Sequence, residues 1–429
     1  MRALLYLTLC AVIISCSPAR KLGLKKSFES AEKNFQHHSG FVLYDPEKKE
    51  TIYDFNGNRY FTPASNTKIF TFYTSLRLIG DSVPALKYVV RNDSLIFWGT
   101  GDPSLLYKFT FNNSRVYDFL KNAKQNLYLS TSNFHSPHFG PGWGWDDYND
   151  VYSAERSPFP VFGNIFTVKR VGSLLTVQPP YFEKFLNIGE RKEKEAITRS
   201  VHANDFEFHP GLTQPKKKEW DVPMRIDQQL ICDLLSDTLD RKVVAVHTPQ
   251  PAITQPIYSI PTDSLYSVMM QESDNFIAEQ LLFICSDIVR DTLQSEIAIK
   301  YSIKNFLNDL PDKPMWVDGS GLSRYNLFTP RSIVKLWEKI HNAVPEDRLF
   351  SLLATGGKKG TIKKWYKADK PYIFGKTGTL SNNHCLSGFL VTKSGKTLIF
   401  AFMNNNYIAT TNAIRTNMQD ILYTIYEKY

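Results

Sequence analysis

The sequence predicts a mixed α/β (α+β) fold in which one discontinuous domain, residues 26–80 and 256–429, encloses a β-rich insertion, residues 81–255. Near both ends of the chain, apolar residues recur at helical spacing and strand-like runs stand between them. In the middle, short alternating runs, aromatic residues and Pro or Gly punctuation prevail. Helices and strands at both ends of a different middle segment indicate one domain interrupted by an insertion.

The first 16 residues differ from the rest of the chain. Met1-Arg2 gives a short positive start, residues 3–14 are almost wholly apolar, and a small residue precedes Cys16. The apolar part is too short to span a bilayer and is typical of an export signal peptide. Its end resembles a bacterial lipobox, which implies a lipid on Cys16, and residues 17–25 are expected to form a tether. An ordinary signal peptide with an incidental cysteine is the alternative.

The 429-residue chain has a formal charge of +9, five cysteines and nine histidines. This length admits two or three domains. The basic residues are dispersed and mixed with acidic ones, as in Arg191-Lys-Glu-Lys-Glu195, whereas nucleic-acid binding predicts a contiguous basic face. A modest positive excess fits anionic envelope polymers at least as well. The cysteines and histidines lack the spacing of a metal site or a disulfide framework, so no metal or cofactor is expected.

The first part of the domain is expected to contain a helix, a hairpin and a buried helix. Apolar residues at 24, 28, 31 and 35 recur at helical spacing. Residues 40–44 and 51–55 flank a polar turn, which is a hairpin signal. Thr62-Pro-Ala-Ser65 then begins a helix that is apolar on most faces and ends at Gly80. Such a helix belongs in the centre of a domain.

The rest of the chain alternates between segments with the two-residue period of strands and segments with the 3.6-residue period of helices. In the insertion, strands are expected at 87–91, 94–98, 164–170 and 174–177, and a helix at 227–238. After it, helical spacing is strong over 262–288 and returns at 297–307, 330–341 and 414–425. Three strands are expected at 372–379, 386–392 and 397–404, the last two joined by a turn.

Three short motifs follow one another in these contexts: Ser65-Asn-Thr-Lys68 at a helix start, Ser273-Asp-Asn275 within the helical period, and Lys376-Thr-Gly378 in an expected strand. A serine hydroxyl is a poor nucleophile until a base takes its proton. A lysine can be that base when burial or a nearby cation lowers its pKa. Lys68 projects from the same helix face as Ser65, and Lys376 can supply the cation. The set therefore predicts serine acyl transfer.

Each motif alone is weak evidence, because the chain contains chance copies. Ser30/Lys33 and Ser332/Lys335 repeat the first pattern on helices that need no catalytic explanation. Ser381/Asn383 repeats part of the second, and Lys393-Ser-Gly395 imitates the third within a hairpin turn. A helix cap, a polar helix turn or a strand end would explain each motif by itself. Order and context together select the three.

The chemistry of acyl transfer suggests a use for the remaining motif residues. Ser273 could relay a proton to a leaving amine, and Asn275 could hold Lys68 and a substrate amide. The segment Lys376 to Thr379 can pair edge-on with an extended peptide. The backbone N–H groups of Ser65 and Thr379 would then form an oxyanion hole.

The three motifs together are the signature of β-lactamases and penicillin-binding proteins. Over nearly everything after the tether, the chain resembles the class C low-molecular-mass penicillin-binding proteins, which are D-alanyl-D-alanine carboxypeptidase/endopeptidases of the penicillin-binding protein 4 type. The supporting segments are Gly101-Asp-Pro-Ser-Leu105, Trp143-Gly-Trp-Asp-Asp147, Ser273-Asp-Asn-Phe-Ile-Ala-Glu279, Asp318-Gly-Ser-Gly-Leu-Ser-Arg324 and Gly375-Lys-Thr-Gly-Thr-Leu380. The long segment between the first and second motifs is that family's most telling feature. The resemblance implies a penicilloyl serine transferase, β-lactamase-like domain with its insertion between these two motifs.

The resemblance also implies a role for each matching residue. Ser65 matches the acylated serine, Lys68 its base, Ser273 and Asn275 the second motif, Lys376, Thr377 and Gly378 the third, and Thr379 the second oxyanion donor. Family members bind the free end of a diaminopimelate side chain, whose amine would meet Asp147, its carboxylate Arg324, and its aliphatic stem Tyr152 and Leu380. Surface ion pairs or loop anchors are the alternative explanation of Asp147 and Arg324. The segment 353–365 departs from the family by lacking a Pro and an Arg.

We therefore expect a periplasmic lipoprotein of the bacterial envelope, anchored through Cys16. It would cleave D-Ala-D-Ala, or the D-Ala to diaminopimelate crossbridge, of peptidoglycan through a Ser65 acyl-enzyme, and β-lactams would inhibit it. A serine β-lactamase is one alternative, which rapid release of hydrolysed penicillin would favour. A non-catalytic peptidoglycan-binding lipoprotein of the same fold is the other, and the intact motifs argue against it.

Overall fold

The computed structural model describes residues 23–107, 114–172, 174–212 and 219–429. The expected signal peptide, Cys16 and most of the tether lie outside the described residues. The first described helix, α2 (Leu24–Phe35), begins inside the segment 17–25 that was expected to be a tether. That boundary was wrong because Leu24 and Phe28 are buried in the core. Within the described ranges, no helix is long and apolar enough to cross a membrane.

A six-stranded antiparallel sheet forms the centre of the discontinuous domain, in the order β14-β15-β16-β17-β1-β2. Its strands are β1 (His38–Asp45), β2 (Glu50–Phe55), β14 (Ala354–Thr355), β15 (Ile373–Leu380), β16 (Asn383–Val391) and β17 (Thr397–Asn405). The strands β1 and β17 pair along their length, with His38 opposite Asn405. Both ends of the chain are thus needed to build one sheet, as the sequence predicted, and the expected hairpins are confirmed.

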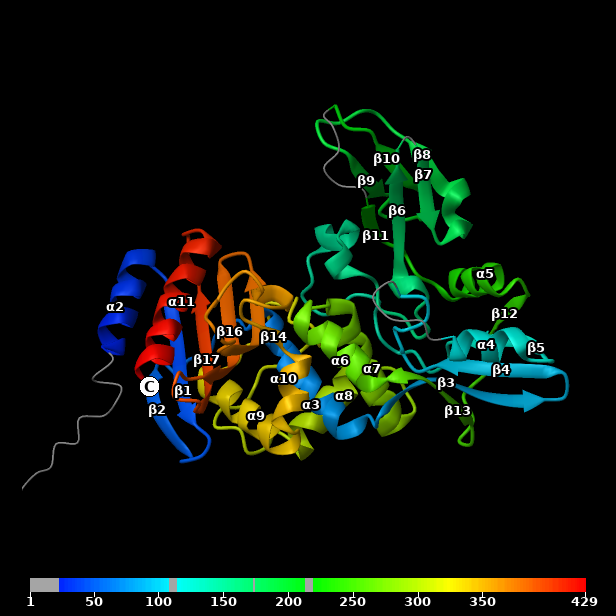
Figure 1. The fold of residues 1–429 in the computed structure, drawn as a ribbon. Helices are drawn as coiled ribbons and strands as arrows, with labels where there is room; N and C mark the ends of the chain where they lie inside the picture. The colour runs from blue at the N-terminus through cyan, green and yellow to red at the C-terminus, as the bar shows by residue number, and fades with distance from the viewer. Residues whose placement is uncertain (1–22, 108–113, 173, 213–218) are drawn as a thin grey trace, which may run out of the picture.

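Side chains along each strand point alternately to the two faces of the sheet, and each face contributes to a separate hydrophobic core. Phe41 and Leu43 of β1 face α2 and the closing helix α11 (Thr411–Lys428), while Val42 faces the opposite side. Figure 1 shows α2 and α11 on one side of the sheet and the other helices of the domain on its far side. The sheet is therefore buried on both faces.

The helices of the far side are α3 (Lys68–Leu78), α6 (Thr262–Gln271), α7 (Asn275–Arg290), α8 (Ser295–Asn305), α9 (Pro330–Ala343) and α10 (Glu346–Leu352). Two of them, α3 and α7, begin at residues of the first and second motifs, Lys68 and Asn275. Eight of the 11 residues of α3 are buried, which confirms the expected central helix. Among these helices, α10 was not predicted from the sequence.

The helical period over 262–288 is two helices and not one. Ser273 at the junction has φ +65°, a left-handed conformation that stops α6. The Asp274 side chain then accepts a hydrogen bond from the N–H of Ile277 and caps α7. The second motif therefore occupies a break between helices, a feature that apolar spacing alone does not reveal.

The insertion contains a mixed five-stranded sheet in the order β12-β5-β4-β3-β13, covered by two helices. The elements are β3 (Ser82–Arg91), β4 (Ser94–Gly99), β5 (Asn126–Ser130), β12 (Val243–Val246), β13 (Gln255–Pro261), α4 (Arg115–Asn122) and α5 (Gln228–Leu239). Strand β13 pairs with β3 as far as Pro261 opposite Ser82. The expected boundary after residue 255 is therefore wrong, since the sheet of the insertion continues to Pro261.

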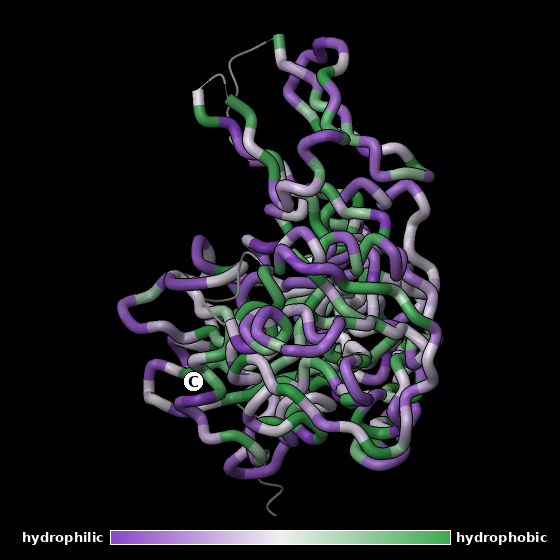
Figure 2. Tube along the Cα trace, turned by 90° about the vertical axis from the view of Figure 1, so that its right-hand side faces the viewer, coloured by the Kyte–Doolittle hydropathy of each residue, from purple (hydrophilic) through white to green (hydrophobic). Residues whose placement is uncertain are grey.

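Two three-stranded sheets complete the insertion. One is β8 (Leu186–Ile188), β10 (Phe206–His209) and β9 (Ala196–Arg199); the other is β11 (Glu219–Pro223), β6 (Ile165–Val171) and β7 (Leu174–Gln178). Figures 1 and 2 show these strands projecting away from the rest of the molecule. Their buried residues, such as Phe166 and Phe206, share one hydrophobic core with the five-stranded sheet.

Candidate active site

Ser65 and Lys68 lie where a short 3₁₀ helix, Ala64–Thr67, becomes α3. Lys68 Nζ is 3.0 Å from Ser65 Oγ, 2.6 Å from Asn275 Oδ1 and 2.7 Å from the carbonyl oxygen of Ser320. Three acceptors match the three N–H groups of an ammonium ion. When Lys68 loses a proton, its lone pair can take the proton of the Ser65 hydroxyl.

The environment of Lys68 favours that loss. Its side chain is fully buried, and burial lowers the pKa of Lys68 to about 8, even though Asp318, Asp274 and Glu279 act in the opposite direction. The sequence suggested Lys376 as the cation that lowers this pKa. In the structure desolvation is the main cause of the lowered pKa of Lys68. Burial, and then repulsion from Lys68, also holds the pKa of Lys376 well below its usual range.

The second motif contacts both the first and the third. Lys376 Nζ of β15 donates to Ser273 Oγ at 2.8 Å, while Asn275 Oδ1 accepts from Lys68. The left-handed backbone of Ser273 costs on the order of 1 kcal/mol or more, and it accompanies the contact of this hydroxyl with Lys376. The Asn275 amide nitrogen donates to the carbonyl oxygen of Tyr152 at 2.9 Å, so one of its two N–H groups is already engaged.

Strand β15 passes directly beside the serine. A Cβ atom on Gly378 would lie 2.4 Å from the carbonyl oxygen of Pro63 and 2.9 Å from the backbone nitrogen of Ser65. Only glycine permits this approach. The neighbouring hydroxyls are held by the fold: Thr377 contacts Thr361 at 2.7 Å and Thr379 contacts His384 Nδ1 at 2.8 Å.

The loop 318–323 seals the buried side of Lys68. Asp318 accepts hydrogen bonds from the backbone N–H groups of Gly321 and Ser323 and from the indole of Trp143. Burial, and then repulsion from Glu279, raises the pKa of Asp318 to about 6. The loop thus fixes the Ser320 carbonyl that receives Lys68.

The four residues expected in a side-chain pocket line the same cavity as Ser65. Its volume is about 780 Å³. The members of the expected set are Asp147, Tyr152, Arg324 and Leu380. The Tyr152 hydroxyl donates to Asp147 at 2.8 Å and to Asp150 at 3.1 Å, and Arg324 Nη2 donates to the carbonyl oxygen of Ser381 at 3.1 Å. An acidic and a basic group therefore border one space beside the serine.

Several residues that organise the site carried no motif signal of their own. Asn66 is buried, donates to the carbonyl oxygen of Lys376 at 3.1 Å and accepts from Ser387 at 2.6 Å, so it joins the first motif to the third. The Tyr107 hydroxyl donates to Asp274. The position of Asn66 inside Ser-x-x-Lys was its available signal, whereas Tyr107 belongs to none of the three motifs and stands two residues after the supporting segment Gly101–Leu105.

Both chance copies of Ser-x-x-Lys lie away from the site, whereas Ser381 of the Ser381/Asn383 copy lines the cavity, and its carbonyl oxygen accepts from Arg324. Ser30 is exposed on α2, and Ser332 is buried on α9, where its hydroxyl bonds the carbonyl oxygen of Asp312 at 3.1 Å. Lys335 pairs with Glu338. No group of three potential metal ligands occurs among the residues that the structure describes.

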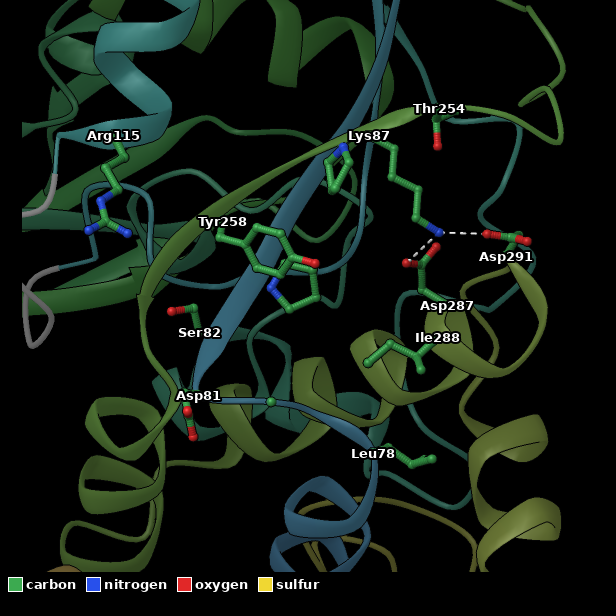
Figure 3. A pocket seen from close by; sticks show the side chains of 13 residues that line it. Leu78, Asp81, Ser82, Lys87, Arg115, Thr254, Tyr258, Asp287, Ile288 and Asp291 are labelled. Carbon is green, nitrogen blue, oxygen red and sulfur yellow. Dashed lines mark hydrogen bonds and ion pairs between the residues drawn. The ribbon is translucent and has the colours of Figure 1, made fainter.

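A second cavity, of about 840 Å³, contains none of the motif residues (Figure 3). It lies where β3 and β13 of the insertion meet the end of α7. On its wall Lys87 contacts Asp287 at 2.8 Å and Asp291 at 2.6 Å. These ion pairs connect the insertion to the helix that Asn275 begins.

Known proteins share this architecture. D-alanyl-D-alanine carboxypeptidase DacB of Haemophilus influenzae is 23% identical over 410 residues, covering 86% of this chain and 85% of that protein. The crystal structure of penicillin binding protein 4 (dacB) from Haemophilus influenzae superposes with a TM-score of 0.74 at 20% identity, covering 93% of this chain and 99% of that one. Its complex with a β-lactam gives 0.69 at 19% identity, with 91% and 97% covered.

These likenesses show the fold that the motifs predicted, a penicilloyl serine transferase domain carrying an insertion. The model of the family described as "D-Ala-D-Ala carboxypeptidase 3 (S13)" matches residues 27–426, which is nearly the whole described chain. The expected resemblance is confirmed. The chain belongs to the D-Ala-D-Ala carboxypeptidase 3 (S13) family of serine peptidases.

Proposed function

We propose that this protein hydrolyses the D-Ala-D-Ala end and the D-Ala crossbridge of peptidoglycan stem peptides through an acyl-enzyme on Ser65. The observation that carries the proposal is the placement of Lys68, which contacts Ser65 Oγ and Asn275 Oδ1 while Lys376 contacts Ser273 Oγ. All three motifs thereby converge on one nucleophile, and the family membership supplies the substrate class.

The reaction follows from this geometry. Lys68 takes the Ser65 proton as Oγ attacks the carbonyl carbon of the penultimate D-alanine. The backbone N–H groups of Ser65 and Thr379 stabilise the oxyanion. The C–N bond then breaks, and the proton taken by Lys68 is relayed to the leaving amine through the Ser273 hydroxyl, which Lys376 holds, so that Lys68 is neutral again and Ser273 keeps its hydroxyl. Water attacks the ester, which releases the shortened peptide and returns the proton to Ser65.

Asp147 and Arg324 favour a substrate whose third residue ends in an amine and a carboxylate. We propose diaminopimelate as this residue, because both groups border the cavity that contains Ser65. An aspartate can pair with its ammonium group and an arginine with its carboxylate. Tyr152 and Leu380 would contact the stem between them.

Labelling with a fluorescent penicillin tests the role of Ser65. The wild-type chain should form a covalent adduct, Ser65→Ala should form none, and Ser30→Ala, a change at an exposed copy of the motif, should label like wild type. Equal labelling of wild type and Ser65→Ala would sink the assignment. Absence of any adduct in all variants would point to a non-catalytic binding protein, and rapid release of hydrolysed penicillin to a β-lactamase.

The reaction products separate the two peptidase activities. Mass spectrometry after incubation with purified crosslinked muropeptides should detect loss of D-alanine from pentapeptides and separation of crosslinked dimers. One serine serves both reactions, since the acyl group is the same and only the leaving amine differs.

The location of the protein is proposed from its first residues. We propose that a signal peptide is removed before Cys16 and that this cysteine carries a lipid, which holds the enzyme in the bacterial envelope on the periplasmic side. The composition of residues 1–16 supports this. Metabolic labelling with a fatty acid should mark wild type and Cys10→Ser but not Cys16→Ser; labelling of Cys16→Ser would contradict it.

A further inference from the structure

The insertion contributes one buried cation to the surroundings of the catalytic lysine. Arg156 follows the short 3₁₀ helix Val151–Ser153, and its side chain is 3% exposed. Its Nη1 lies 3.1 Å from Glu279 Oε2 of α7. Its Nη2 donates to the carbonyl oxygens of Pro137 and Phe139 at 3.0 and 2.9 Å. The guanidinium group is therefore fixed from two sides.

Glu279 connects this arginine to the site. Its second oxygen, Oε1, accepts the backbone N–H of Ser320 at 2.8 Å, and the carbonyl oxygen of Ser320 accepts from Lys68 at 2.7 Å. Glu279, Ser320 and Lys68 are all fully buried. A short chain of hydrogen bonds thus runs from the insertion to the base of the reaction.

The charges along this chain of hydrogen bonds affect how easily Lys68 loses its proton. Glu279, Asp274 and Asp318 all face Lys68 and stabilise its charged form, while Lys376 is the cation on the side of β15. Arg156 compensates one of the three carboxylates. Without it the potential at Lys68 becomes more negative, and the ammonium form becomes harder to deprotonate.

We propose that Arg156 is a positioning residue for acyl transfer: it fixes Glu279, which holds the Ser320 carbonyl against Lys68, and it balances the charge of Glu279 beside that lysine. The proposal rests on the proposed function, because it assigns Lys68 as the base. It also gives the insertion a part in the chemistry, through a residue outside all three motifs.

A purely structural role for Arg156 makes a different prediction. Loss of a buried ion pair would then lower thermal stability and activity together, without moving the pH at which activity rises. The positioning role predicts two opposite shifts. Arg156→Gln removes a positive charge and should move the acid limb of the pH profile upward. Glu279→Gln removes a negative charge while its amide oxygen can still accept from Ser320, and should move that limb downward.

The experiment measures the second-order rate of acylation by a fluorescent penicillin between pH 6 and pH 10, on the full chain. Each single variant should shift the acid limb by about one pH unit, or about tenfold in rate below pH 7. The double variant Arg156→Gln/Glu279→Gln should return the limb near that of wild type. Arg156→Lys keeps the charge but loses the planar guanidinium group with its several N–H donors. Its acid limb should stay at the wild-type pH, while its overall acylation rate is lower.

Arg170→Gln is the matched control, since Arg170 also pairs with a carboxylate of the insertion, Glu195, and borders no part of the catalytic cavity. Its acid limb should stay in place. Shifts of Arg156→Gln and Glu279→Gln in the same direction, or no shift in Glu279→Gln, overturn the proposal. If Arg156→Gln does not fold, the positions of the acid limb in Glu279→Gln and in the double variant test the proposal. A wild-type chain that is not acylated would overturn the proposed function instead.

Discussion

Lys68 Nζ lies 3.0 Å from Ser65 Oγ in a fully buried position that also receives the Asn275 side chain. In the proposed mechanism, this contact makes the protonation of Lys68 the control on acylation. Below the pKa of Lys68 the ammonium group cannot accept the Ser65 proton, and above it the amine can.

The rate of β-lactam acylation should therefore rise with pH and level off above about 8, the pKa to which burial lowers Lys68. Lys68→Met removes the base and should slow acylation by at least ~100-fold above pH 8, with a smaller difference at lower pH, where Lys68 of the wild type is itself protonated. Lys33→Met, at the exposed copy of the motif on α2, should keep the wild-type profile. An acid limb near pH 6 would assign the base to another group.

Gly378→Ala should displace strand β15 from the serine, because the added Cβ would lie 2.4 Å from the carbonyl oxygen of Pro63. A displacement of this kind near reacting atoms lowers the rate by about 100-fold. Gly80→Ala is the control, since nothing lies within 4 Å of its added Cβ. Acylation rates and thermal unfolding of both variants check the prediction; unchanged acylation in Gly378→Ala would mean that the strand can shift without loss.

Asp147→Asn should lower kcat/KM for peptides that contain diaminopimelate by about 10-fold, the loss of one charge-assisted hydrogen bond. The same variant should react normally with peptides that have a neutral residue at that position and with penicillin. Asp146→Asn, one residue away and outside the lining of the catalytic cavity, should behave as wild type on all three. A general loss of activity in Asp147→Asn would indicate a loop anchor in place of a specificity residue.

Lys87→Met should destabilise the junction between the insertion and α7, since it leaves Asp287 buried without its cation. The cost is on the order of 3 kcal/mol at pH 7.5. Burial raises the pKa of Asp287 to about 6, above its value in the unfolded chain, so its ionisation destabilises the fold as pH rises through that range. The loss should accordingly be smaller at pH 5.

Urea unfolding at both pH values measures the effect of Lys87→Met. Lys25→Met, which removes an exposed pair with Glu29, should change the free energy of unfolding by less than about 0.5 kcal/mol. An equal loss at pH 5 and pH 7.5 would contradict the role given to Asp287.

Local spacing predicted the elements of the fold well. The helix from Ser65, the three C-terminal strands and the long insertion follow from periodicity and turn residues, and the order of the motifs predicted the family. The break at Ser273 was missed because apolar spacing does not reveal a left-handed φ, and the Lys376 contact that accompanies it comes from a residue about a hundred positions away. The network through Arg156 was missed for the same reason, since no spacing rule joins it to Glu279.

The pairing of β1 with β17 determines the order in which the two parts of the molecule can fold during synthesis. Strand β1 ends at Asp45, and its partner β17 begins at Thr397, so the central sheet stays open until residues 397–405 have been synthesised. The insertion has its own core and no such dependence. During synthesis the insertion can fold early, whereas the site around Ser65 cannot assemble until β15, which is also made late, has been synthesised. A nascent chain that has not reached β15 therefore has Ser65 and Lys68 but lacks Lys376, and under the proposed mechanism it has no peptidase activity.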